Sequence, residues 1–375
     1  MIGVTMLKTY ELRNYNFKLF FLLIVISSMG VIFVNGADAS YTNKHIVGLA
    51  GSIVIMIFVS LIDYNTLCKF WWVFYGFNCI VLVFVTLVGL EVNGAKRWFK
   101  LPGFGTIQPS EFAKIIMIIC VAIFLERHKD DLNTLKTLVK LAVLCAVPIF
   151  LIAIETDLST SIDITVILIA MIFVAGLSYR IIITVLAVLI PLICGFLYYV
   201  DHAKKVFLLK EYQVGRIRDF LHPANAVNDT GWQQDNSVMA IGSGMLHGKG
   251  INSSTGITVK DANLVPEQQT DFIFSVVGEE FGFIGCVFVI AILLLIMLQC
   301  IRMARRARNT SGMLIATGIA SMICFQSFIN ISVATKLFPN TGLPLPFISY
   351  GLSSLLSCMI GMGLVLNIGL QRRKY

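Results

Sequence analysis

Charged residues are scarce in this chain of 375 residues: Asp, Glu, Lys and Arg make up 13%, whereas 57% of the residues are hydrophobic. Soluble globular domains carry roughly 25% charged residues, so this composition excludes a soluble domain. Apolar runs near the roughly 20 residues that cross a hydrocarbon core of about 30 Å recur along the chain. Because these runs are continuous, they predict membrane-spanning helices and not the strands of a barrel.

The chain also lacks the patterns of a disulfide framework or a metal site. All nine cysteines fall in or beside apolar runs, and none falls in the long polar loop. His202, His222 and His247 lack the spacing of metal ligands. No small-residue cleavage pattern follows the first apolar run, which favours a retained first helix over a removed signal peptide.

The fold class that we predict is an all-α polytopic membrane protein, with residues 1–375 forming a single integral membrane domain. The expected spans lie near residues 17–35, 45–62, 70–90, 111–125, 139–154, 161–178, 181–200, 271–299, 313–334 and 350–370. The number of expected spans, about ten, is taken as even, and an even number of crossings leaves both termini on one side of the membrane. A large loop, residues 201–270, lies between spans seven and eight.

The distribution of Lys and Arg predicts which side is the cytoplasm. With the termini inside, the short inner segments hold 14 of these residues and the short outer loops hold five, namely Lys44, Lys96, Arg97, Lys100 and Lys336. This bias follows the positive-inside rule, so we expect cytoplasmic termini and an extracellular 201–270 loop. The net charge of +8 is then mostly a topology signal and indicates no nucleic-acid partner.

The stretch Val265–Phe274, VPEQQTDFIF, joins a polar segment to a long apolar run. Asp271 is expected at the membrane boundary, where apolar neighbours raise the pKa of a carboxyl group and suit it to general-base catalysis. The alternative is that Thr270 or Asp271 merely caps the eighth helix. Glu279 and Glu280, about two turns deeper, are expected to face the protein interior.

Other charged groups gather near the expected outer face. Arg97 and its basic neighbours in NGAKRWFKL, residues 93–101, favour equally an interfacial anchor and a site for a phosphate-bearing lipid. Glu111 and Lys114 stand three apart on one helical face, which predicts an ion pair that fixes the helix and lines a cavity. Asp157, in the connection that also holds Glu155, is either a helix cap or a cavity residue.

The outer loops carry further local signals. Residues 212–221 predict an amphipathic interfacial helix that ends near Pro223, with Arg216 and Arg218 placed to face phosphate. The glycine-rich residues 240–250 predict tight turns. Gln326 and Asn330, four apart, favour hydrogen bonds between helices. Residues 338–351 are apolar but broken by three prolines, so this segment is expected to be non-helical and buried in protein.

Seven motifs follow one another in an order typical of one family: NGAKRWF, QPSEFAK, ETDLSTS, YQxxRxxxFLxP, AIGSGxxxGKG, PEQQTDFIFSVVGEEFGFIG and PNTGLPLPFISYG. On these motifs the chain resembles the SEDS family of polytopic cell-wall proteins over nearly its whole length. The amino-terminal Tyr10–Phe17 and the compact length resemble the RodA elongation branch more than the FtsW division branch or the sporulation branch (SpoVE).

The resemblance implies a peptidoglycan glycosyltransferase that polymerises lipid II at the outer face of the bacterial plasma membrane, during elongation and maintenance of cell shape. It implies Asp271 as the catalytic carboxylate, a class B penicillin-binding protein (a transpeptidase) as partner, and contact with membrane lipid. No motif for a bound cofactor is recognisable, although a divalent cation, Mg or Mn, would suit a diphosphate leaving group. The matching motifs assign substrate contacts to Arg97, Glu111, Lys114, Asp157, Arg216 and Glu267.

The chain departs from the family pattern at several backbone positions. The usual Pro-Asp-Leu-Gly-Thr is here Thr156-Asp157-Leu158-Ser159-Thr160. The other departures are Asn236 for glutamine, Leu352 for the second of two glycines, and Ser332 and Lys336 for small glycines. The charged groups are kept, so these changes bear on fine geometry and on the branch.

Two other functions suit a polytopic membrane protein. A lipid II flippase would carry charged groups through the membrane midplane, whereas here most of them cluster on the expected outer side. A non-catalytic scaffold for a class B penicillin-binding protein would tolerate loss of Asp271.

Overall fold

The computed structural model describes residues 15–92, 95–101, 105–203, 206, 211–222, 230–251 and 265–371. Its long helices are α2 (Phe17–Ala37), α3 (Thr42–Leu61), α5 (Trp71–Val88), α6 (Pro109–Arg127), α7 (Leu135–Ile154), α8 (Leu158–Val174), α9 (Tyr179–His202), α12 (Ile273–Arg305), α13 (Thr310–Ala334) and α14 (Leu352–Leu370). Each expected span coincides with one of these helices. The amino-terminal motif up to Asn14, and Pro223, lie outside the described residues.

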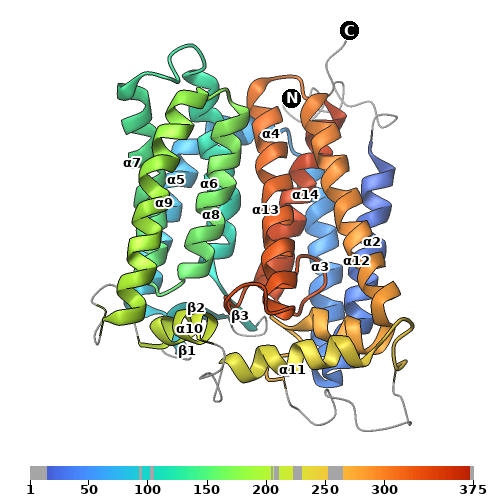
Figure 1. Ribbon diagram of the computed structural model, residues 1–375. Coiled ribbons are helices and arrows are strands. Elements are labelled where there is room, and N and C mark those ends of the chain that lie inside the picture. The colour runs from blue at the N-terminus through green and yellow to red at the C-terminus, as the bar shows by residue number, and fades with distance from the viewer. Residues whose placement is uncertain are drawn as a thin grey trace.

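The protein is a multi-pass, all-α membrane protein, as the composition predicts. Within the described ranges, eight helices are long and apolar enough to cross a membrane, and α8 is a shorter apolar helix. The start of α2 and the end of α14 lie at one end of the bundle, as an even number of crossings requires (Figure 1).

The bundle has two groups of helices in Figure 1, with α5 to α9 on one side and α2, α3, α12, α13 and α14 on the other. The groups meet where α13 packs against α6 and α8. Both α6 and α14 are buried along most of their length. In α14, serines and glycines allow neighbouring helices to approach closely, as is common between membrane helices.

Three short strands form a small antiparallel sheet that the sequence analysis did not predict. The order is β1 (Leu90–Val92), β2 (Ala95–Leu101), β3 (Gly105–Ile107). Hence most of the stretch 93–101, for which an interfacial anchor and a phosphate-lipid site were equally favoured, forms the central strand. The sheet lies at the end of the bundle opposite to the start of α2 (Figure 1), and it holds Arg97 in a fixed place beside α6.

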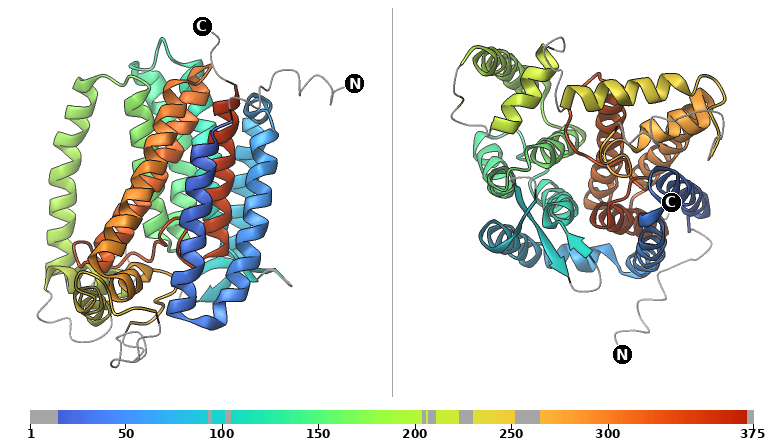
Figure 2. Two further views of the ribbon diagram at one scale, coloured as in Figure 1. Left: turned by 90° about the vertical axis from the view of Figure 1, so that its right-hand side faces the viewer. Right: turned by 90° about the horizontal axis from the view of Figure 1, so that it is seen from below.

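Two short helices of the 201–270 loop also lie across this end of the bundle (Figures 1 and 2). The first, α10 (Glu211–Leu221), confirms the predicted helix. The second, α11 (Thr230–Ser243), includes residues 240–243, so the expectation of tight turns throughout 240–250 is wrong. Elsewhere, a single turn of 3-10 helix (Ala39–Tyr41) precedes α3, and α4 (Tyr64–Lys69) precedes α5.

The turn after α11 packs against a break in α12. Gly282 has a φ of +64°, which ordinary residues rarely adopt, and it interrupts the helix. The freed backbone groups bond to the turn: Phe283 N–H donates to Met245 O at 2.9 Å, and Lys249 N–H donates to Glu279 O at 2.9 Å. Glu279 and Glu280 are buried, as predicted, and the Lys249 Nζ lies 2.7 Å from Glu279 Oε1.

The segment 335–351 between α13 and α14 is non-helical, and it is buried at Asn340, Leu343 and residues 345–349, which confirms the expectation for the proline-rich stretch. Asn330 binds this segment and not another helix, because its Nδ2 donates to Leu343 O at 2.8 Å. The prediction of interhelical bonding is therefore wrong for Asn330. Gln326 is buried, and among the described residues neither its Nε2 nor its Oε1 has a hydrogen-bond partner.

Candidate active site

Asp271 lies in a turn immediately before α12 and is half-buried. The residue at the cap position of α12 is Phe272, and no side chain caps the helix, so the alternative of Asp271 as the cap is wrong. Asn330 Nδ2 donates to the backbone oxygen of Asp271 at 2.8 Å. Since the same amide binds Leu343 O, it ties the turn before α12 to the segment 335–351.

The backbone of the segment 335–351 approaches the Asp271 carboxylate closely. Gly342 has a φ of +77°, and a Cβ built on it would lie 3.2 Å from Asp271 Oδ2. Ser159 Oγ donates to the neighbouring Thr341 O at 2.5 Å, and Arg216 Nη1 donates to Asn340 O at 3.3 Å. Thus α8, α10 and the segment converge around one carboxylate.

Electrostatics at Asp271 suit a base that works near neutral pH. Burial raises the pKa of this carboxyl group to about 6, while Arg216 and Arg97 act in the opposite direction and Glu267 adds to the rise. Glu267 is exposed and has a φ of +54°. Three of the predicted substrate residues therefore act on the predicted catalytic residue.

Asp157 is the centre of a second polar group. Arg97 Nη1 lies 3.4 Å from its Oδ1, and Asp157 is 2% exposed. Its Oδ2 accepts hydrogen bonds from Gln108 Nε2 at 2.6 Å and from Ser110 Oγ at 3.1 Å. It also caps α8, accepting from Thr160 N–H at 3.2 Å, which confirms the interpretation of Asp157 as a helix cap.

Glu111 and Lys114 form a third group, within the helices. The predicted ion pair is confirmed, with Lys114 Nζ 2.9 Å from Glu111 Oε2. Asp163 of α8 lies 3.5 Å from the same nitrogen, and Ser357 Oγ donates to Glu111 at 3.3 Å. Lys114, Glu111 and Asp163 are all buried, so one cation serves two acids away from water. In the described part of the chain, neither Glu111 nor Lys114 forms an ion pair or a hydrogen bond with Asp271.

The sequence analysis left two acidic residues of this region outside its candidate set. Asp163 completes the buried group around Lys114. Glu155 is 2% exposed, and neither of its carboxyl oxygens has a hydrogen-bond partner in the described part of the chain. Burial, and secondarily Asp157, raises the pKa of Glu155 to about 9, against the opposing charge of Arg97. The sequence signal that could have identified Glu155 is its position two residues before Asp157, since two carboxylates in so short a connection are unusual.

Comparison with known proteins decides the family. A sequence model of the FtsW/RodA/SpoVE family, described as "Cell cycle protein", matches residues 12–374. The chain belongs to this family. The resemblance to SEDS proteins, drawn above from motifs, is thereby confirmed.

Named SEDS relatives cover almost the whole chain. The chain is 32% identical over 380 residues to a protein of Trichlorobacter lovleyi named "Probable peptidoglycan glycosyltransferase FtsW", covering 96% of this chain and 94% of that protein. It is 33% identical over 352 residues to the Escherichia coli K12 "Peptidoglycan glycosyltransferase MrdB", covering 94% and 91%.

A solved structure has the same SEDS fold. It is a chain described under "Structural coordination of polymerization and crosslinking by a peptidoglycan synthase complex", with a TM-score of 0.79 and 26% identity. The alignment covers 95% of this chain and 97% of that one.

Departures from the SEDS pattern have local structural consequences. Thr156, where the family pattern has proline, has a φ of +65°, a value closed to proline because its ring holds φ near −65°. Ser159, in place of glycine, supplies the hydroxyl that binds Thr341 O. Lys336, in place of glycine, has a φ of +59° and an ion pair with Asp235. The changes therefore alter backbone conformation and contacts near the site while the carboxylates remain.

Proposed function

We propose that this protein is a peptidoglycan glycosyltransferase that polymerises lipid II, with Asp271 as the general base. The observation that carries the proposal is the half-buried Asp271 carboxylate, whose pKa is raised to about 6, beside Arg216 and Arg97. The names of the relatives support the reaction class. Asp271 would take the proton from the 4-hydroxyl of the acceptor N-acetylglucosamine as its oxygen attacks the anomeric carbon of the lipid-linked N-acetylmuramic acid.

The proposed roles of the other residues follow from the three groups. Arg97 and Arg216 would neutralise the departing undecaprenyl diphosphate, because guanidinium groups match phosphate oxygens in geometry and charge. Asp157 would hold Arg97 in position, and Glu267 would line the entrance beside Asp271. The buried Glu111 and Lys114 would fix α6 against α8 and α14.

We propose that any divalent cation in the reaction arrives bound to the substrate and is not held by the protein alone. Among the described residues, no group of three or more His, Cys, Asp and Glu side chains is placed to hold a metal ion. The residues do not fit a metal site built from protein ligands alone, so the proposed steps do not pass through a metal. Mg or Mn would accompany the diphosphate of the substrate.

The proposed location of the reaction is the outer face of the bacterial plasma membrane. The bias of 14 inner against five outer Lys and Arg supports cytoplasmic termini. With that orientation, Asp271 would lie at the outer end of α12. The proposed partner is a class B penicillin-binding protein. The likeness to a chain of a peptidoglycan synthase complex that coordinates polymerization and crosslinking supports this choice.

We keep elongation and cell-shape maintenance as the proposed cellular role, with division as the competing one, because relatives named MrdB and FtsW match at nearly equal identity. Complementation distinguishes the two. Rescue of rod shape in a strain depleted of its elongation polymerase supports the proposal, and rescue of septation alone contradicts it.

The test of the proposed chemistry is polymerisation of lipid II by the purified full chain with its penicillin-binding partner, followed as glycan length on a gel. We expect polymer from the wild type and none from a folded Asp271→Asn variant. Asp235→Asn is the matched control, since this exposed carboxylate lies at the same end of the molecule on α11. Equal polymer from wild type and Asp271→Asn would remove Asp271 from the mechanism, and no polymer from either would favour a flippase or a scaffold.

A further inference from the structure

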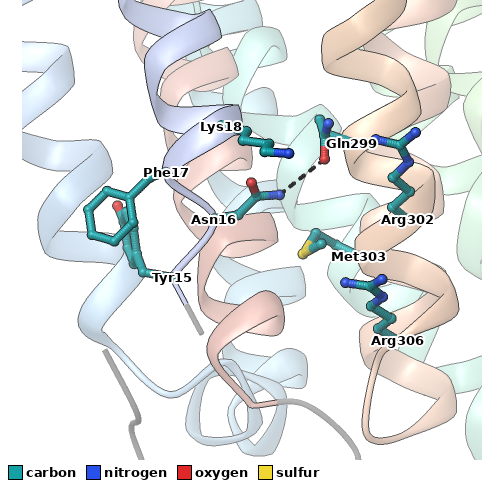
Figure 3. Close-up of a pocket in the computed structure, with 8 residues that line it drawn as sticks. All are labelled: Tyr15, Asn16, Phe17, Lys18, Gln299, Arg302, Met303 and Arg306. Atoms are coloured by element: carbon teal, nitrogen blue, oxygen red, sulfur yellow. Dashed lines mark hydrogen bonds between the residues drawn. The ribbon is translucent and has the colours of Figure 1, made fainter. Parts of the chain in front are cut away.

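A pocket of about 430 Å³ lies between the start of α2 and the end of α12, at the opposite end of α12 from Asp271 (Figure 3). It is lined by Tyr15, Asn16, Phe17, Lys18, Gln299, Arg302, Met303 and Arg306. The sequence analysis counted Arg302 and Arg306 only as a topology signal, and it did not count Lys18, which falls within the first expected span. That signal accounts for their side of the membrane and does not account for their meeting in one cavity.

The lining is strongly cationic. Lys18 extends from α2 toward α12, and Arg302 and Arg306 line the pocket from α12 (Figure 3). No acidic residue is among the lining residues, and none of the three cations forms an ion pair with a described residue. Arg302 lies in the last turn of α12 and Arg306 directly follows the helix, so two like charges repel each other at this helix end. An anion in the pocket would relieve this repulsion.

The floor of the pocket is polar and ordered. Asn16 Nδ2 donates to Gln299 Oε1 at 3.4 Å, and both side chains are 8% exposed. Asn16 Oδ1 accepts from Leu19 N–H at 3.1 Å, which fixes the amide as the cap of α2. The hydrogen bond between Asn16 and Gln299 joins the start of α2 to α12 between Lys18 and Arg306 (Figure 3).

The surroundings indicate where the anion comes from. Phe17 and Phe21, both 66% exposed, lie on the outer face of α2, and Leu298 and Ile301 are exposed on α12. These faces belong to membrane-spanning helices, so acyl chains can lie along them while a headgroup enters the pocket. Arg side chains bind phosphate oxygens through two parallel hydrogen bonds, and basic pockets between membrane helices are suited to anionic headgroups.

We propose that this pocket binds the phosphate of an anionic phospholipid from the leaflet at this end of the bundle, through Lys18, Arg302 and Arg306. The site is separate from the one that contains Asp271, and it does not depend on the proposed glycosyltransferase activity. A bound lipid would bridge α2 and α12 at the end where α12 leaves the membrane. It would thereby stabilise the helix whose other end carries Asp271.

The test is lipid retention by the purified full chain, measured by native mass spectrometry against phosphatidylglycerol and phosphatidylcholine. We expect a preference for phosphatidylglycerol in the wild type, and a loss of about tenfold or more in its affinity in the Arg302→Gln/Arg306→Gln variant. Lys18→Gln alone, a milder change on the other helix, should give a smaller loss. The control is Arg305→Gln/Arg308→Gln, which removes the same charge at the same end of α12 outside the pocket.

Three outcomes would overturn the proposal. The first is an equal loss in the pocket and control variants, because that result would show only general attraction to an anionic surface. The second is displacement of phosphatidylglycerol by millimolar inorganic phosphate, which would make the ligand a free anion. The third is tighter binding of an acidic peptide than of lipid, which would make the pocket a protein-docking site. Far-ultraviolet circular dichroism of each variant identifies any that fails to fold.

Discussion

Replacement of Asp271 by asparagine should abolish polymerisation and at the same time stabilise the protein. Burial raises the pKa of this carboxyl group from 3.8 to about 6, a change of about two units. Each unit corresponds to about 1.36 kcal/mol, so the ionised carboxylate costs the folded state about 3 kcal/mol at neutral pH. Asparagine has nearly the same shape and no charge, and it removes this cost.

The sign of the pH dependence follows from the raised pKa. The folded-state pKa lies above that of the unfolded chain, so the wild type is relatively most stable below about pH 4 and loses this stability as the pH rises through about 6. The Asp271→Asn variant does not have this loss. Its thermal midpoint should therefore exceed that of the wild type by a few degrees at pH 7.5 and match it near pH 4.

The assay is thermal unfolding in detergent, followed by intrinsic fluorescence at pH 4, 6 and 7.5. The Asp235→Asn control should show no gain, because it removes an exposed carboxylate that pairs with Lys336. A gain for Asp271→Asn that is the same at every pH would refute the electrostatic reasoning. So would a variant that is less stable than the wild type at pH 7.5.

Three further predictions concern the site and its support. The initial rate of lipid II polymerisation should rise with pH through about 6 and then level, because Asp271 must be ionised to accept a proton; a rate that falls over this range would contradict the role of base. Lys114→Met leaves the buried Glu111 and Asp163 without their cation, so it should destabilise the fold by roughly 3–5 kcal/mol. This loss would appear as a lowered thermal midpoint, and an unchanged midpoint would show that the ion pair is dispensable. Gly342→Ala should slow polymerisation by roughly tenfold to a hundredfold and lower stability by about 1–2 kcal/mol, because its φ of +77° disfavours a side chain and a Cβ 3.2 Å from Asp271 Oδ2 would displace the carboxylate. Gly351→Ala, where a Cβ would meet its nearest neighbour at 3.8 Å, is the control, and equal rates from the two variants would argue against a steric role.

Local signals in the sequence were sufficient for the helices and for one ion pair. Continuous apolar runs predict spanning helices because a membrane leaves the backbone no other way to satisfy its hydrogen bonds. The spacing of Glu111 and Lys114 predicts their contact because residues three apart share a helical face. The proline-rich segment before α14 was expected to be buried for the same reason, since uncharged irregular backbone cannot face lipid.

Contacts between distant segments could not be predicted in this way. The strand at 95–101 depends on pairing with two other short segments, and its sequence alone favoured equally an interfacial anchor and a phosphate-lipid site. Asn330 was assigned to helix contacts, yet it binds the turn at Asp271 and the segment that follows α13, because only the folded chain brings these backbone oxygens to it.

The sequence by itself determined that this chain spans a membrane many times, that it belongs with the SEDS proteins, and that Asp271 is its leading catalytic candidate. Composition, hydropathy period and motif order are properties of the chain, so they need no coordinates. Only the tertiary structure decided which charges act on Asp271, that Asp163 shares the Lys114 cation, and that cations from α2 and α12 meet in one pocket. Electrostatic energies depend on distance and burial, and both are set by packing between segments far apart in the sequence.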